Sequence, residues 1–461
     1  MRNRLLTVLS LGALLVPTLA AATPGTVDSG DTAFVLICAG LVMLMTPGLA
    51  FFYGGLVRAK NVVHTMILSL VCMAMVGVLW LVVSYSIAFS RGPAGLDWFV
   101  GGLSWVGLVG VDGSVVKELA PTIPHTAFML FQAMFAIITP ALISGALVER
   151  IRIKAFVAFI LVWAVVVYAP VAHWVWAPGG WLRAKGVLDF AGGTVVHINA
   201  AAAALVGAIL LGRRRGLRSP TVLPHNVPFA ILGAGLLWFG WLGFNGGSAL
   251  AANGLAATAF ANTFFAPAAA ATAWGLAELF FFHGKMSGVG LASGAVAGMV
   301  AITPAAGYIT PASSVLLGFM AGIASLLAVR YRPRLGLDDS LDVFAVHGVA
   351  ATLGALMTGV LASKAVNPDG ADGSLALLGW QAVGVLVTYA WSGSLSFLLF
   401  KGLSLIMPLR AEEQDEWSGM DQAEAGERAY VYSDDSAGEQ RHGPSHAPSM
   451  VGVPVHRAAQ E

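Results

Sequence analysis

The chain has 461 residues, of which 57% are hydrophobic and only 11% are charged. Because a soluble domain carries about 25% charged residues, we expect most of this chain to lie in lipid. The formal net charge of +1 argues against a nucleic-acid partner. The two cysteines, Cys38 and Cys72, lie inside apolar segments and lack metal-ligand spacing, so we expect neither a metal site nor a disulfide.

Residues 1–22 have the pattern of a cleaved signal peptide. Arg2 and Arg4 precede an apolar run, and the alanines at 20–22 supply a small-residue cleavage site. An uncleaved first anchor is the alternative, but about 15 apolar residues with a proline are short for a membrane span. Cleavage would leave the mature N-terminus outside the cytoplasm.

Residues 23–408 are predicted to form one transporter domain with eleven membrane spans of about 20 residues each. The spans lie near 32–57, 62–89, 126–147, 153–173, 194–212, 226–246, 255–281, 286–304, 309–330, 341–363 and 376–406. Loops that follow odd-numbered spans hold thirteen Lys and Arg residues, against five after even-numbered spans. The positive-inside rule therefore places the odd loops and the C-terminus in the cytoplasm.

The odd count predicts an all-α integral membrane protein in which two inverted halves of five helices are followed by one extra C-terminal helix. His197 and His347 then fall in the last span of each half. Ionisable groups at that depth are costly and usually functional, and inverted repeats place their binding site at the interface of the halves. We therefore expect the two histidines to meet in a pathway for a small polar or protonatable solute. Two unrelated packing histidines, or a haem or metal site, are the alternatives.

After residue 408 the composition changes. Residues 409–461 are polar, acidic and poor in aliphatic side chains, so they cannot build a core of their own. We expect a cytoplasmic regulatory tail that is partly disordered, with disorder over about its last 25 residues.

Several strings resemble the ammonium transporter family (Amt, with its Rh relatives), and in particular its bacterial Amt type. They are DFAGGTVVHINAAAAALVGAILLGRRRG at 189–216, FFYGGLVRAKNVV at 51–63, FQAMFAIITPALISGALVER at 131–150, GWLGFNGGS at 240–248, DDSLDVFAVHGV at 338–349 and, in the tail, EWSGMDQAEAGERAY at 416–430. The resemblance covers all eleven predicted spans.

The resemblance implies roles for eight residues along one pore. An outer site that recruits ammonium would consist of Phe131, Trp176 and Ser248. A gate of two stacked rings would consist of Phe135 and Phe244, and the pore beneath it would be lined by Trp241, His197 and His347. Trp174 and Trp181 are rivals of Trp176, since spacing from Asp189 suggests an insertion here. Aromatic faces attract ammonium by about 0.5–2 kcal/mol each.

Aspartates begin two of the spans. Asp189 starts the fifth span, where it either caps the helix, as the helix dipole favours, or supports cation binding indirectly. Asp338, Asp339 and Asp342 precede the tenth span, and we expect them to cap it.

The predicted function is transport of ammonium or ammonia across a bacterial cytoplasmic membrane, with no enzyme activity and no cofactor. Ammonium would be captured outside and deprotonated, and ammonia would cross the pore; whether the proton follows is left open. The resemblance further implies a homotrimer in membrane lipid and a PII-type regulator at the cytoplasmic face, to which Gly419, Asp421, Gly426 and Tyr430 of the tail would contribute. An ammonium sensor or a Rh-like channel for ammonia or carbon dioxide is the alternative.

Overall fold

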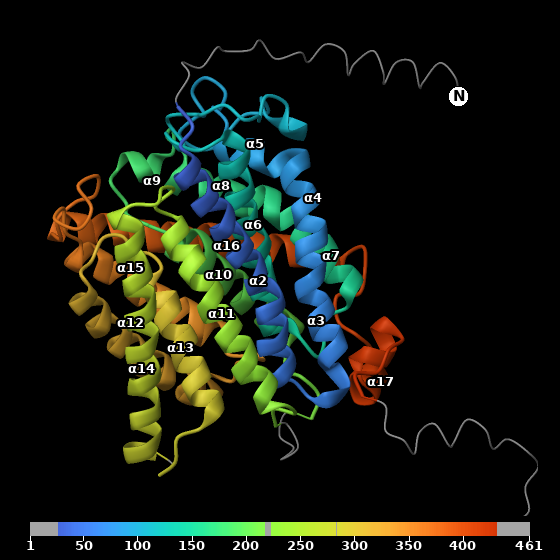
Figure 1. The fold of residues 1–461 in the computed structure, drawn as a ribbon. Helices are drawn as coiled ribbons and strands as arrows, with labels where there is room; N and C mark the ends of the chain where they lie inside the picture. The colour runs from blue at the N-terminus through green and yellow to red at the C-terminus, as the bar shows by residue number, and fades with distance from the viewer. Residues whose placement is uncertain (1–25, 217–222, 283, 431–461) are drawn as a thin grey trace, which may run out of the picture.

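The computed structural model describes residues 26–216, 223–282 and 284–430 (Figure 1). The predicted signal peptide at 1–22 and the final part of the tail therefore lie outside the described residues. Ten helical segments within this part of the chain are long and apolar enough to cross a membrane, and the shorter apolar helix α13 makes an eleventh. The predicted all-α membrane fold is confirmed.

Among the first five spans, the first and third are single α-helices, whereas short π-helical turns interrupt or open the helices of the second, fourth and fifth. The five spans are α2 (Ser29–Leu56); η1 (Ala59–Asn61), α3 (Val62–Val71), η2 (Cys72–Val76), α4 (Gly77–Leu79), η3 (Trp80–Ser84) and α5 (Tyr85–Phe89); α6 (His125–Leu147); α7 (Ile153–Trp163), η5 (Ala164–Tyr168), α8 (Ala169–Trp176) and α9 (Trp181–Ala184); and η6 (Gly193–Ile198) with α10 (Asn199–Leu211). A short turn, η4 (Val106–Leu108), lies in the loop after α5.

The remaining spans follow the same pattern. They are α11 (Val227–Gly247); α12 (Gly254–Ala277) with η7 (Glu278–Phe282); α13 (Gly288–Ile302); α14 (Pro311–Tyr331) with η8 (Arg332–Leu335); η9 (Phe344–Val349) with α15 (Ala350–Leu361); and α16 (Leu375–Ser404). The tail adds α17 (Glu413–Ser418) and η10 (Asp421–Ala425).

Small residues bring the first helices of the two predicted halves into direct contact, as α2 runs along α11 (Figure 1). A Cβ atom on Gly233 would lie 2.2 Å from the backbone nitrogen of Phe52, and one on Gly240 would lie 2.6 Å from the carbonyl oxygen of Leu41. Only glycine fits at such an approach, which is how helices pack closely in membranes.

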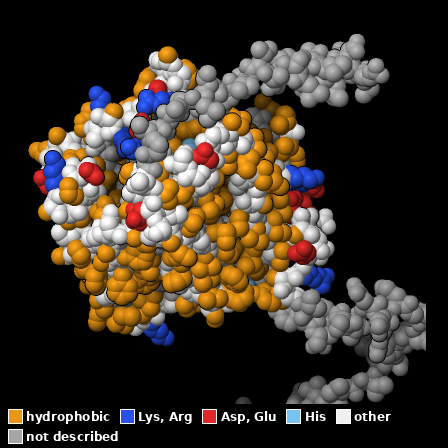
Figure 2. Space-filling view, turned by 45° about the horizontal axis from the view of Figure 1, so that its top comes forward, with side chains coloured by type: hydrophobic (Ala, Val, Ile, Leu, Met, Phe, Trp, Pro, Cys, Tyr) orange, Lys and Arg blue, Asp and Glu red, His pale blue; other side chains and the backbone are white. Residues whose placement is uncertain are grey.

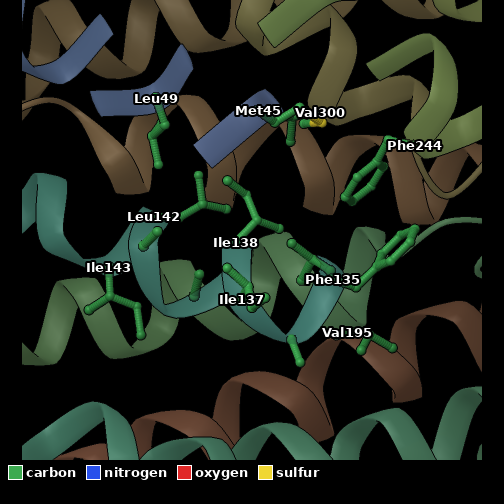
Figure 3. Packing of buried hydrophobic residues seen from close by; sticks show 14 of the residues in the cluster. Met45, Leu49, Phe135, Ile137, Ile138, Leu142, Ile143, Val195, Phe244 and Val300 are labelled. Atoms are coloured by element: carbon green, nitrogen blue, oxygen red, sulfur yellow. The ribbon is translucent and has the colours of Figure 1, made fainter. Parts of the chain in front are cut away.

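Aliphatic and aromatic side chains from α2, α6, α11 and α13 fill the interior between these helices, as Figure 3 shows for Leu49, Leu142 and their neighbours. The outer surface carries a broad expanse of hydrophobic side chains, with charged side chains gathered near its margins (Figure 2). A hydrophobic surface with charges at its two ends suits a bilayer.

The loops after the first, third and fifth spans meet at one end of the bundle in a buried ion network. Glu149 pairs with Arg58 at 2.9 Å and with Arg214 at 2.8 Å, and Arg214 also pairs with Asp338 at 2.8 Å. Arg150 lies 3.7 Å from the same aspartate. These odd-numbered loops therefore share one side of the membrane, as the distribution of Lys and Arg predicts.

The prediction that all three aspartates at 338–342 cap a helix is only partly correct. Asp339 does cap, since its Oδ2 accepts from the Phe344 backbone N–H at 2.6 Å. Asp338 instead belongs to the ion network, and Asp342 pairs with Arg332 at 2.5 Å. Arginines, from distant loops for Asp338 and from the preceding turn η8 for Asp342, supply stronger partners for these two carboxylates than the helix end does.

The first part of the tail docks at the same end, beside α3 (Figure 1). Asp421 Oδ1 accepts from the His64 backbone N–H at 2.8 Å, and Asn61 Oδ1 accepts from the Met420 N–H at 2.9 Å. Arg410 binds both oxygens of Glu416, at 2.5 and 2.8 Å. Residues 409–430 are thus held to the loops of the bundle by specific polar contacts.

Removing one carboxylate from the ion network should destabilise the protein strongly. Asp338→Asn leaves Arg150 without its buried counter-charge and leaves Arg214 paired with Glu149 alone, and breaking a buried pair costs about 3–5 kcal/mol. We expect a clearly lower midpoint of thermal unfolding for the purified protein in detergent. The control is Glu118→Gln, because the Arg91–Glu118 pair spans 3.4 Å and its side chains are 84% and 60% exposed; an exposed pair contributes about 1 kcal/mol or less. Equal losses in the two variants would contradict this assignment.

The same network should make stability depend on pH in the acidic range. Burial alone would raise the pKa of Glu149 and of Asp338, but the arginines around them, Arg214 above all, lower both pKa values to about 2. Ordinary values are 4.5 and 3.8, so the stabilisation is complete above about pH 5 and is lost as the pH falls toward 2. Thermal unfolding recorded from pH 7 to pH 3 should show this loss, and Asp338→Asn should show a shallower one.

Candidate pore and substrate site

An outer cavity of about 520 Å³ opens at the end of the bundle opposite the tail. Its wall includes Phe135 from α6, Trp176 from α8 and Ser248 at the end of α11. Two of the three residues predicted for outer recruitment, Trp176 and Ser248, therefore share one cavity. The Ser248 hydroxyl donates to the Phe244 carbonyl at 2.9 Å, so its oxygen is oriented to accept from a ligand.

Trp176 is distinguished from its two rivals by its contacts. Its Nε1–H donates to the Asp189 carbonyl at 2.9 Å, and its ring lies edge-on to Phe135 with centroids 5.7 Å apart. Trp174 instead packs against Trp391 and Trp181, at 5.1 and 6.1 Å. Of the three tryptophans, Trp176 is the one that lines the cavity.

Phe131 is not among the residues that line the outer cavity. Its side chain is fully buried, its ring lies 4.9 Å from that of Phe135, and its edge faces the backbone of Gly247. The i, i+4 spacing does put Phe131 and Phe135 on one helix face. Phe131 supports the ring of Phe135 from behind, and Phe128 and Gln132 form the cavity wall beside it.

Two phenylalanine rings close the bottom of the outer cavity. Phe135 and Phe244 lie with centroids 4.2 Å apart and ring planes at 32° (Figure 3). Both side chains are fully or almost fully buried. The two rings are in contact but tilted rather than parallel, and they lie between the cavity and the histidines beneath.

His197 and His347 meet directly below the phenylalanines. Their Nδ1 atoms are 3.3 Å apart, and their rings are nearly parallel with centroids 5.4 Å apart. The ring of His197 lies 6.1 Å from Phe244. One Nδ1 donates and the other accepts, so the pair shares a proton between two neutral rings. The expected meeting of the two histidines is confirmed.

The backbone places the two histidines in equivalent positions. His197 lies in η6 and His347 in η9, two six-residue π-helical segments that each open an α-helix. π-Helical turns in membrane helices often mark functional sites. Gly193 allows this arrangement, because a Cβ there would lie 2.6 Å from the ring of Pro304.

Trp241 lies directly beside the histidine pair. Its ring stacks on His197 with centroids 5.2 Å apart and an interplanar angle of 15°. Its Nε1–H donates to Thr303 Oγ1 at 2.8 Å, and that hydroxyl donates to the Met299 carbonyl at 2.7 Å. The indole is thereby fixed, and with it the orientation of the histidine ring.

An inner cavity of about 300 Å³ reaches His347 from the tail side. Tyr53, Arg214, Arg332 and Asp342 line it. The order along the molecule is therefore outer cavity, phenylalanine pair, histidine pair and inner cavity. The described ranges contain no group of three or more His, Cys, Asp or Glu side chains that could hold a metal ion.

Asp189 adopts a capping geometry. Its carboxylate accepts from the backbone N–H groups of Gly192, Gly193 and Thr194 at 2.9, 2.6 and 2.8 Å, from that of Val195 at 3.2 Å, and from the Thr194 hydroxyl. Four N–H groups that open a helix are thus satisfied. Of its two predicted roles, the geometry favours the cap, which also fixes the carbonyl that holds Trp176.

Sequence reasoning missed several residues of the outer cavity. Gln132 lies three positions before Phe135 on α6, so helical spacing alone could have indicated it. Tyr308 and Asp369 come from connecting segments and Arg183 from the short helix α9, where no periodicity relates them to the site.

Replacing Asp189 should unfold the start of the fifth span. Asp189→Ala leaves four buried N–H groups without an acceptor. Each unsatisfied group lowers the free energy of unfolding by about 1–3 kcal/mol if the surrounding structure does not rearrange. We expect a lower midpoint of thermal unfolding in the absence of any ammonium, with a smaller effect for Asp189→Asn. Asp369→Asn, an exposed aspartate of the same cavity, serves as the control. A variant that keeps its stability and loses only ammonium binding would show that the cap is secondary.

Comparison with known proteins identifies the family to which this chain belongs. Residues 33–430 match the Ammonium Transporter Family. An ammonium transporter of Bacillus subtilis is 46% identical over 406 residues, which cover 87% of this chain and 98% of that protein. The crystal structure of Candida albicans Mep2 superposes with a TM-score of 0.79 at 34% identity over 85% of this chain and 88% of that one. A structure titled Sensor Amt Protein superposes with a TM-score of 0.78 at 30% identity, over 86% of this chain and 98% of that one. The chain belongs to the ammonium transporter family, whose members are transporters rather than enzymes.

Proposed function

We propose that this protein transports ammonium by binding the cation in the outer cavity, removing its proton and conducting ammonia past the histidine pair. The observation that carries the proposal is the position of His197 and His347, in contact with each other between the two cavities. Phe131, Trp176 and Ser248 form the recruitment site in this proposal, with Phe131 acting through the ring of Phe135.

Loss of hydration is the physical reason for deprotonation. A bare cation in a narrow apolar passage loses its water shell at a cost of several kcal/mol or more. Two neutral imidazoles offer no counter-charge, whereas they can donate to and accept from ammonia. The adjacent rings of Phe135 and Phe244 exclude water and hydrated ions until they turn aside.

The fate of the proton decides the energetics. If it follows along the histidine pair, the membrane potential drives transport with about 2.3 kcal/mol per charge per 100 mV. If it stays outside, ammonia crosses as a neutral solute down its own gradient. The hydrogen-bond contact between the two Nδ1 atoms, 3.3 Å apart, supports the first version.

The same proposal includes an orientation in a bacterial cytoplasmic membrane. The arginine-rich loops and the docked tail share one end, so the positive-inside rule favours a cytoplasmic tail and an external outer cavity. A homotrimer, and a PII-type regulator that binds the cytoplasmic face, belong to this proposal through the family resemblance. Asp421 and its neighbours Gly419 and Gly426 already form an ordered, docked segment there, in which both glycines have positive φ.

Two alternatives use the same pore. A sensor is favoured by the likeness to the Sensor Amt Protein, and would couple ammonium binding to a signal through the tail or a partner. A Rh-like channel for ammonia or carbon dioxide needs no cation site, whereas Trp176 and Ser248 line the outer cavity together. That pairing favours the ammonium transporter.

Uptake of labelled methylammonium into cells tests the proposed pore. His197→Ala and His347→Ala should each reduce uptake at least about ten-fold, since ammonia then loses its hydrogen-bond partners in the passage. Phe131→Ala should reduce it less, by loosening Phe135. The control is His125→Ala, because His125 is equally buried but bonds Tyr85 away from the pore, at 2.5 Å. Normal uptake in both pore variants would refute the proposal.

Electrical recording on liposomes that contain the purified protein separates the two proton routes. A current evoked by ammonium and absent in His197→Ala is expected if the proton follows the pair. Ammonia flux without current would establish the neutral route and remove the electrogenic version.

A further inference from the structure

We infer that Gln132 is a further ammonium-binding residue, whose side-chain oxygen accepts a hydrogen bond from the cation in the outer cavity. The inference rests on the proposed function and adds one ligand to the same site. Gln132 lines the cavity together with Trp176 and Ser248. Its side chain is only 8% exposed, and its Oε1 is buried without a hydrogen-bond partner among the described residues.

A buried amide oxygen without a hydrogen-bond partner indicates that a donor is missing from the site. Buried polar groups in proteins are nearly always hydrogen-bonded, because an unsatisfied one forfeits its bonds to water. Gln381, the other glutamine in the interior, shows the ordinary case. Its Oε1 accepts from the Leu188 N–H at 2.8 Å, and its Nε2 donates to the carbonyls of Leu188 and Ala355 at 2.8 and 2.9 Å. Gln132 has no such role in holding the backbone.

The position of Gln132 fits a ligand at the bottom of the cavity. On α6 it lies three residues before Phe135 and four after Phe128, so the three side chains share one face of the helix, and all three line the cavity. The amide turns about its Cγ–Cδ bond at little cost, so the oxygen can follow a donor that enters from outside.

Ammonium supplies four N–H donors in a tetrahedral arrangement, and the site offers matching partners. The oxygen of Ser248 accepts one, the rings of Phe135 and Trp176 attract the charge, and the oxygen of Gln132 accepts a second. Because the amide is neutral, it binds the cation without holding it as a carboxylate would. Methylammonium has one N–H fewer and a methyl group to place, so a second acceptor favours ammonium over methylammonium.

The experiment measures the half-saturation concentration for ammonium-evoked current or flux in liposomes that contain the full-length protein. Gln132→Leu removes the acceptor and should raise the half-saturation at least about ten-fold, with little change in the rate at saturation. It should also narrow the preference for ammonium over methylammonium. Gln132→Glu keeps an oxygen of the same reach and should restore tight binding. The comparison variant Gln381→Leu removes the hydrogen bonds that hold the Leu188 backbone and should lower thermal stability, an effect not expected of Gln132→Leu.

The outcomes separate the two claims. Wild-type protein without ammonium flux would overturn the proposed function itself. Wild-type flux with an unchanged half-saturation and preference in Gln132→Leu would overturn the role of Gln132 alone. Should Gln132→Leu fail to fold, Gln132→Met removes the oxygen at similar length and is judged by the same two measurements.

Discussion

The contact between two imidazole rings is the interaction on which the pore depends. A charged partner for a buried histidine would bring a permanent charge into the passage, at the cost of its desolvation. His197 and His347 avoid this, because each Nδ1 serves as the partner of the other across 3.3 Å. The proposed passage therefore keeps polar atoms for a small solute without a net charge.

That contact needs a frame that fixes two rings on opposite halves of the bundle. η6 and η9 place the histidines at the same level, and Trp241 holds the face of His197 through its bond to Thr303. Close packing of α2 on α11, at glycines without room for a Cβ, joins the first helices of the halves. Shape rather than burial of apolar area orders such an interior, since lipid is as apolar as the side chains.

A residue of the site could be predicted from the sequence where a local pattern fixes its position, but not where contacts with distant parts of the chain do. The lengths of the apolar segments predicted the membrane spans, and the position of two histidines inside such segments predicted that they meet. Both predictions follow from the cost of placing polar groups in lipid. The i, i+4 pair Phe131 and Phe135 shared a face, yet spacing could not tell which ring lines the cavity and which supports it. Asp338 was expected to cap a helix because it precedes one. Its arginine partners could not be recognised, since they lie more than 120 positions away in the chain.

The buried arginines connect the inner cavity to the tail. Arg214 lines that cavity and is held by Glu149 and Asp338, while the next residue, Arg215, donates its backbone N–H to Glu416 of the tail at 3.3 Å. Breaking a buried pair leaves an uncompensated charge, so this loop has few alternative positions while the network is intact. The tail consequently docks on the same loop that contributes Arg214 to the inner cavity, so the contacts that stabilise the fold at this end also hold part of the cavity wall.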